Sequence, residues 1–170
     1  MKYTTSLLIR YILVFLPLGF LYYLLTPITI YLVRFCLYFW NPIVIGNLMV
    51  INGIPFTFID ACIAVYAYWL ILFLALSVKD LEIIKRLKII FFGFILILLM
   101  NVFRIVLLIF ITVDYGFAAF NLIHLFFWKF VSWIYVALLW IIMTKYYNVK
   151  SIPVYSDYKY LIKLIRKHKN

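Results

Sequence analysis

The chain has few charged residues and few residues that break helices. Only 12% of its 170 residues are charged, and it contains 5 glycines and 5 prolines. Hydrophobic residues make up 69% of the sequence, and the mean hydropathy is +1.17. An ordinary globular domain is about half apolar and about a quarter charged. So much apolar surface cannot be hidden within a chain of this length, which excludes a soluble domain and predicts contact with lipid.

Cysteine and other side chains that bind metals are also scarce. Cys36 and Cys62 are the only 2 cysteines, beside 2 histidines and 5 acidic residues. Two cysteines exclude a disulfide framework, and their spacing is not that of a metal site. The sequence has no HExxH motif, no Gly-rich phosphate loop and no Ser nucleophile motif. We therefore predict no cofactor and no metal ion.

Basic residues greatly exceed acidic ones, and the net charge is +11. Such a charge is also typical of nucleic-acid binders. Here, however, the lysines and arginines gather in two short segments that flank apolar runs, around 78–88 and from Lys145 onward. This distribution predicts cytoplasmic loops and contacts with anionic lipid, not a nucleic-acid partner.

Long apolar runs predict an all-α integral membrane bundle of about four to five transmembrane helices. The predicted spans are Leu7–Leu25, Ala61–Ser77, Lys88–Val113 and Asn121–Thr144. Pro27 is predicted to interrupt the first helix, so that Ile28–Trp40 forms a bent or interfacial continuation, with a fifth span there as the alternative. A short outer loop is predicted over Asp114–Phe120.

Residues 41–60 differ from the apolar runs in their composition and pattern. The turn dipeptides Gly46-Asn47 and Asn52-Gly53 separate short strand-like stretches, and Asn-Gly is the strongest short hairpin signal. Because this segment has no Lys or Arg, we predict a small extracytoplasmic β-hairpin. The chain is then one membrane domain with four parts: an N-terminal helix with its bent segment (1–40), the hairpin (41–60), a three-helix core (61–144) and a basic cytoplasmic tail (145–170) ending in an amphipathic helix over Tyr158–Arg166.

Three polar residues in the predicted spans are candidates for function. Arg104 has apolar neighbours on both sides, and a charge at that depth is costly unless it is functional or paired. Cys62 and His124 are predicted at the outer ends of two other spans. Taken alone, Cys62 also fits a small inert hydrophobe and His124 a hydrogen-bonded interfacial residue. All three can nevertheless converge in the outer half of one small bundle.

Cysteine, histidine and arginine together form a chemically sensible set. A nearby cation favours the thiolate, which attacks an acyl carbon with the help of a base. A buried guanidinium can stabilise the oxyanion that develops. The supporting polar residues are Asn101, Asn121 and Asp60. Asn101 can hold the guanidinium of Arg104 from one turn away, whereas Lys129 and Cys36 fit structural roles.

The order of these residues resembles the exosortase/archaeosortase family of membrane transpeptidases. The matching motifs are Ile59-Asp60-Ala61-Cys62, Asn101-Val102-Phe103-Arg104-Ile105 and a His at the outer end of the next helix, His124. The likeness extends over residues 43–130. The chain departs from the family where Ile63-Ala64 replaces Ser-Gly after the Cys and where no Gly follows the His. Its short length and composition look like an archaeal member.

The resemblance implies a cysteine peptidase and transpeptidase in the cell membrane, with its active site facing outside. Such enzymes cleave C-terminal sorting signals of surface proteins, each made of a short motif, a membrane helix and a basic cluster. They transfer the protein to a membrane or cell-surface acceptor, such as a lipid. By resemblance, Cys62 is the nucleophile, His124 the general base and acid, and Arg104 the stabiliser of the thiolate or oxyanion. The hairpin is expected to contact the sorting motif.

Two other functions are compatible with the sequence. A non-enzymatic membrane assembly subunit would tolerate Cys62→Ala. A small anion transporter or channel would use Arg104 and Lys129 to line its path, although transporters are often larger and built from repeats, which are not found here.

Overall fold

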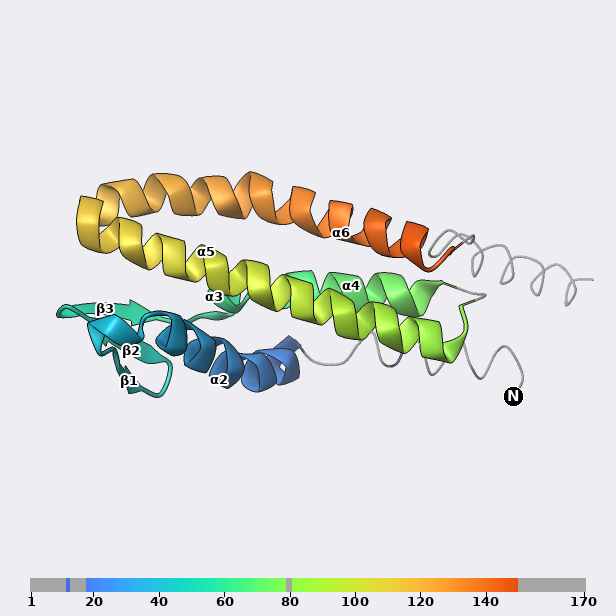
Figure 1. Ribbon diagram of the computed structural model, residues 1–170, viewed down its shortest axis with the longest axis horizontal. Helices are drawn as coiled ribbons and strands as arrows, with labels where there is room; N and C mark the ends of the chain where they lie inside the picture. Colours follow the sequence, from blue (N-terminus) through green and yellow to red (C-terminus); the bar gives the residue numbers. More distant parts are fainter. Residues whose placement is uncertain (1–11, 13–17, 79–80, 150–170) are drawn as a thin grey trace, which may run out of the picture.

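The computed structural model describes residues 12, 18–78 and 81–149 (Figure 1). This part of the chain is mostly helical, with a small three-stranded antiparallel sheet at one end. Helices and short strands therefore occur together, as predicted. Most of the predicted span before Leu18, the basic residue Lys79 and the tail from residue 150, with its predicted amphipathic helix, lie outside the described residues.

Helix α2 spans Leu18–Cys36 and continues through Pro27. The predicted interruption at Pro27 is therefore wrong, although the segment from Ile28 is a continuation of the first helix, as expected. Proline has no backbone N–H, so one hydrogen bond of the helix is missing at this point. α2 packs against both α4 and α5, which holds the helix together across the missing bond.

The predicted hairpin is a meander of three strands. A 3₁₀ turn, η1 (Tyr38–Trp40), leads to β1 (Ile43–Ile45), β2 (Leu48–Ile51) and β3 (Ile54–Thr57), which pair in sequence order. Both turns lie at the predicted dipeptides. In the second, Asn52 (φ 50°) and Gly53 (φ 78°) both have positive φ, as a type I′ turn requires.

Two short helices replace the predicted span Ala61–Ser77. Helix α3 covers Asp60–Ile63 and α4 covers Val65–Ser77, and Ala64 between them is left-handed, with φ 58° and ψ 35°. The prediction of one unbroken helix here is wrong. The break places the chain's second cysteine on a single helical turn of its own.

Helix α5 (Ile83–Phe126) replaces the next predicted span and the predicted loop over Asp114–Phe120. The only non-helical residue inside it is Gly116, with φ 79° and ψ −178°, a backbone region open almost exclusively to glycine. Figure 1 shows the chain reversing near this position, at the end of the molecule that carries the sheet. The predicted seven-residue loop is wrong because one glycine suffices for the reversal. A π-helix, η2 (Phe127–Val131), and α6 (Ser132–Tyr146) complete the returning arm.

One face of α5 organises the packing of the molecule. Its buried residues recur every three to four positions, as expected for a helix packed on one side. Gly93 lies on this face, and a Cβ there would meet Ile71 Cγ2 of α4 at 2.9 Å, so the two helices approach closely. Arg86, also buried, donates to the Ala75 and Val78 carbonyls at 3.1 and 2.8 Å and so closes the end of α4.

Much of the outer surface is apolar. On α5 alone, Phe91, Leu99 and Phe103 are each about three-fifths exposed, at 61%, 59% and 58%. Two helical segments of the described chain are long and apolar enough to cross a membrane: Leu18–Cys36 and the continuous run Ile83–Tyr146. Helix α4 is apolar but shorter.

Candidate active site

Cys62 lies on α3, directly after the sheet. The chain leaves β3 in an extended conformation at Ile59 (φ −100°, ψ 170°), makes one helical turn, and stops at the left-handed Ala64. A non-glycine residue in this region costs of order 1–3 kcal/mol and persists only where the surroundings impose it. Such strain is often found at functional sites, and here the strained residue lies two positions after Cys62.

Arg104 supplies the contacts that hold this turn. Its side chain is only 5% exposed, and its Nη2 donates to the carbonyls of Ala61 and Cys62 at 3.2 and 3.0 Å. These carbonyls belong to the last turn of α3, where the break at Ala64 leaves them without partners from a continuing helix. The guanidinium therefore caps α3, and its positive charge lies where a helix end favours a cation.

His124 reaches the same region from the returning arm of α5. Its ring stacks on Phe120, with ring centroids 5.2 Å apart and an angle of 20° between the planes. The Nδ1 atom is buried and has no hydrogen-bond partner among the described residues. The charge of Arg104 is close enough to interact electrostatically with both Cys62 and His124.

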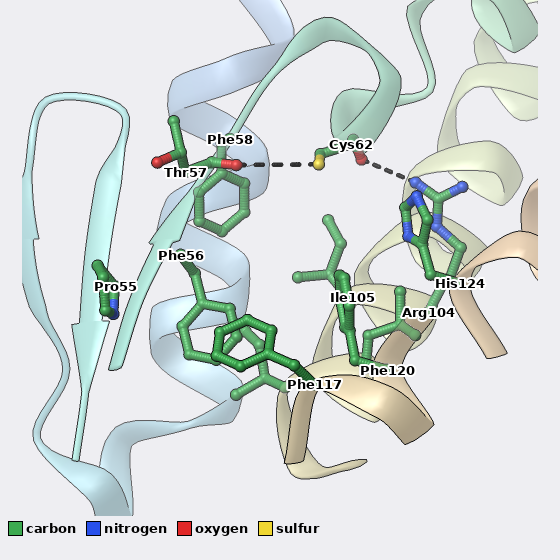
Figure 2. A pocket seen from close by; sticks show the side chains of 12 residues that line it. Pro55, Phe56, Thr57, Phe58, Cys62, Arg104, Ile105, Phe117, Phe120 and His124 are labelled. Carbon is green, nitrogen blue, oxygen red and sulfur yellow. Dashed lines mark hydrogen bonds between the residues drawn. The ribbon is translucent and has the colours of Figure 1, made fainter. Parts of the chain in front are cut away.

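A cavity of about 170 Å³ brings the three predicted site residues together (Figure 2). Cys62, Arg104 and His124 all line it, although they come from three separate segments of the chain. The rest of its wall is almost entirely apolar. The other lining residues are Pro55, Phe56, Thr57, Phe58, Ile105, Leu108, Ile109, Phe117 and Phe120.

The thiol of Cys62 points toward the end of β3. Its Sγ lies 3.9 Å from the Thr57 carbonyl, a weak contact, and the residue is half-buried (Figure 2). The sheet is therefore one wall of the site. The opposite wall includes Phe117 and Phe120, which sequence reasoning missed because it assigned them to a loop. Their spacing from His124, at one and two helical turns, was the signal that could have found them.

The three supporting residues are not part of this cavity. Asn101 is buried, but both its side-chain polar atoms lack a partner among the described residues, and it does not bond the guanidinium as predicted. It faces instead a smaller cavity of about 30 Å³ that Arg104 also lines. Asn121 is exposed, and Asp60 lines a separate groove beside Tyr22.

Cys36 and Lys129 are both exposed and lie outside the cavity. Within the described residues, no three His, Cys, Asp or Glu side chains gather as a metal site would require.

No protein-family model matches the sequence, and no curated protein or solved structure matches it either.

Proposed function

We propose that this chain is a multi-pass membrane cysteine peptidase and transpeptidase of the exosortase/archaeosortase kind. The observation that carries the proposal is that Cys62, Arg104 and His124 line one cavity although they lie on three separate segments. A thiol, an imidazole and a guanidinium are the groups that acyl transfer through a thioester requires. The apolar remainder of the wall suits a peptide segment from a membrane-anchored protein.

In this proposal the chain crosses the bilayer four times. The crossings are α2, the pair α3–α4, the first arm of α5, and the returning arm that ends in α6. The reversal near Gly116 makes two crossings of the long apolar run, and the exposed aromatic and aliphatic side chains face lipid. Two basic residues, Lys85 and Lys88, lie at the start of α5, and Lys145 lies near the end of α6. Both of these helix ends are at the end of the molecule away from the sheet (Figure 1). In this proposal that end of the molecule is cytoplasmic.

This arrangement sets the site near the outer membrane boundary. Arg104 is about 30 Å along the helix axis from Ile83, at a rise of 1.5 Å per residue. The hydrocarbon core is also about 30 Å thick. If α5 enters the core near its start, the guanidinium is close to the outer interface, where a charge costs much less than at the midplane. A substrate helix beside the bundle would then present its outer end to Cys62.

The first half of the reaction makes the acyl-enzyme. His124 takes the proton of the Cys62 thiol, and the sulfur attacks the carbonyl carbon of the scissile peptide bond. The tetrahedral intermediate collapses by breaking the C–N bond, and the leaving amine takes the proton from His124. The products are a thioester on Cys62 and the released membrane tail of the substrate.

The second half transfers the acyl group. A nucleophile, such as water or an amine or hydroxyl of a membrane lipid, attacks the thioester and gives its proton to His124. The C–S bond breaks, and the sulfur leaves as the thiolate or, with the proton returned from His124, as the thiol. Arg104 assists both halves by fixing α3, and with it Cys62, through its hydrogen bonds to the Ala61 and Cys62 carbonyls, and its positive charge in the site can stabilise the oxyanion that develops.

The hydrogen bonds of Arg104 bear on the transporter alternative. A residue that lines an anion path needs its guanidinium free to bind passing ions. Here one nitrogen is already shared between two backbone carbonyls, and the side chain is almost completely buried. This use of the charge favours a structural and catalytic role over conduction.

A processing assay in cells tests the proposal. The substrates are reporter proteins that end in a varied six-residue segment, an apolar helix of about 20 residues and a Lys/Arg cluster, the length being that of a membrane span. Each is expressed with the wild-type chain, with Cys62→Ala, or with Cys36→Ala as the matched control. Removal of the tail is measured by gel shift and confirmed by intact mass.

We expect cleavage by the wild type and by Cys36→Ala, and none by Cys62→Ala present in the membrane at the same level. Cleavage by Cys62→Ala at the wild-type rate would eliminate the thiol mechanism. A wild-type protein that cleaves no member of the reporter set would argue against a peptidase and for the assembly subunit.

A further inference from the structure

The hydrogen bonds of β3 show which of its backbone groups face outward. Ile51 and Ile54 close the two-residue turn, so they form a hydrogen-bonded pair, and such pairs alternate along antiparallel strands. The Phe58 N–H donates to the Asn47 carbonyl at 2.9 Å, which fixes the same alternation from the other end. Thr57, opposite Leu48, is therefore at a non-bonded position, as is Pro55.

Backbone groups at non-bonded positions point away from the partner strand. The outer edge of β3 thus presents the Thr57 N–H, the Thr57 carbonyl and the Pro55 carbonyl, while Pro55 has no N–H to offer. The Thr57 carbonyl faces Cys62 Sγ, as this geometry requires. In the part of the chain that the structure describes, no strand pairs with this edge.

The unpaired edge runs along the cavity and ends at the candidate nucleophile. Residues 55–58 form one wall of the cavity, and Phe117 and Phe120 are on the other (Figure 2). Pro55 and Thr57 are exposed, and Phe117 is 60% exposed, so the space between the walls opens to the surface. An extended peptide fits such a slot, with its backbone beside β3 and every second side chain toward the aromatic wall.

We propose that the outer edge of β3 binds the substrate segment next to the scissile bond as a fourth strand. The inference rests on the proposed function and specifies how that site holds its substrate. The occupant is an extended polypeptide, because unpaired backbone N–H and C=O groups complement another backbone and not a lipid tail. Main-chain hydrogen bonds then supply affinity without regard to sequence, and the aromatic wall selects side chains.

The edge also determines where the scissile bond lies. In antiparallel pairing, Thr57 exchanges two hydrogen bonds with one substrate residue, and Pro55 accepts a third from the residue two positions along. The pair at Thr57 brings the substrate backbone beside Cys62 Sγ, since that sulfur already contacts the Thr57 carbonyl. Binding replaces this weak thiol contact with a substrate N–H and so releases the sulfur for attack.

Proline substitutions at matched positions test this inference. Thr57→Pro removes the outward N–H and leaves the ladder to β2 intact, because Thr57 makes no backbone hydrogen bond to Leu48. Val44→Pro is the control, since Val44 holds the equivalent non-bonded position on the outer edge of β1. Pro55→Ala is the converse change and adds an N–H to the edge. Each variant is purified as the full chain, and KM and kcat are measured with a reporter tail that the wild type cleaves.

We expect Thr57→Pro to raise KM by about tenfold or more, because it removes one hydrogen bond and leaves a substrate carbonyl unpaired. Pro55→Ala should lower KM by about twofold to tenfold, because it adds one backbone hydrogen bond. Val44→Pro should change KM by less than about twofold, because Val44 lies on β1 and makes no hydrogen bond to the substrate. Alkylation of Cys62 by a maleimide checks that α3 is intact. If Thr57→Pro fails to fold, the result for Pro55→Ala decides.

An unchanged KM in Thr57→Pro, or in Pro55→Ala where that variant decides, would overturn the strand inference while leaving the peptidase proposal standing, provided Cys62→Ala remains inactive. Cleavage that does not depend on Cys62 would instead defeat the proposed function itself.

Discussion

Replacing Arg104 with methionine should destabilise the folded protein by about 2–5 kcal/mol, because it removes the two hydrogen bonds that cap α3. In the wild type, one guanidinium nitrogen reaches the Ala61 carbonyl at 3.2 Å and the Cys62 carbonyl at 3.0 Å. A hydrogen bond to a charged group contributes about 1.5–3 kcal/mol. Two bonds from one nitrogen do not add fully, and removing a buried charge relieves its desolvation, so the loss stays below the simple sum.

The assay is thermal unfolding of the purified protein in detergent, followed by tryptophan fluorescence. At about 2–4 °C per kcal/mol, the expected fall in Tm is roughly 4–20 °C. Arg104→Lys keeps the charge and one donor group, so its Tm should lie between those of the wild type and Arg104→Met. Arg34→Met, at an exposed position in the last turn of α2, is the control and should change stability by no more than about 0.5 kcal/mol. A wild-type Tm for Arg104→Met would refute the capping role.

Three backbone and packing substitutions give further predictions, each measured as a change in Tm. Gly116→Ala should destabilise by about 1–3 kcal/mol, because φ is 79° and ψ −178° at the reversal of α5, and an unchanged Tm would place the turn elsewhere. Ala64→Gly should stabilise by up to about 1 kcal/mol, since glycine adopts the left-handed conformation without strain, and a lower Tm would argue against strain at this break. Gly93→Ala should destabilise by about 1–3 kcal/mol, because the added Cβ would lie 2.9 Å from Ile71. Its combination with Ile71→Ala should lose less than the two single effects summed, whereas full additivity would contradict the close approach.

The elements that sequence reasoning found are those that local chemistry determines. The Asn52-Gly53 dipeptide specifies its turn without help from the rest of the chain, so the strands beside it could be placed. The long apolar runs likewise predicted helices. Pro27 was misjudged because a proline signal is also local, whereas the packing of α2 against two other helices overrides it.

The features that were missed depend on tertiary contacts. Alanine favours helix, so the residues near Ala64 give no local signal of a break. The carbonyls that the break leaves without helix partners accept hydrogen bonds from Arg104, some forty positions along the chain. The reversal at Gly116 was placed in the right region but predicted as a loop, because Asp114 and Gly116 interrupt the apolar run there. The helical stripe of Phe117 and Phe120 leading to His124 was therefore hidden.

Sequence reasoning predicted which residues line the candidate site better than it predicted which contacts hold them in place. Cys62, Arg104 and His124 were expected to converge, and they line one cavity. Asn101 was expected to hold the guanidinium, but backbone carbonyls do so. Which carbonyls lack partners depends on where a helix breaks, and a single sequence gives no direct signal of that. The chemical roles of the three residues remain predictions.

The most direct measurement is the covalent state of Cys62 during turnover. Purified protein is mixed with a reporter that it cleaves, quenched in acid, digested and analysed by mass spectrometry. The account predicts a fragment of the reporter attached to Cys62 as a thioester, which hydroxylamine releases and which is absent from Cys62→Ala. Cleavage with no adduct on Cys62, under conditions that trap a control thioester enzyme, would contradict it, as would an adduct on another residue.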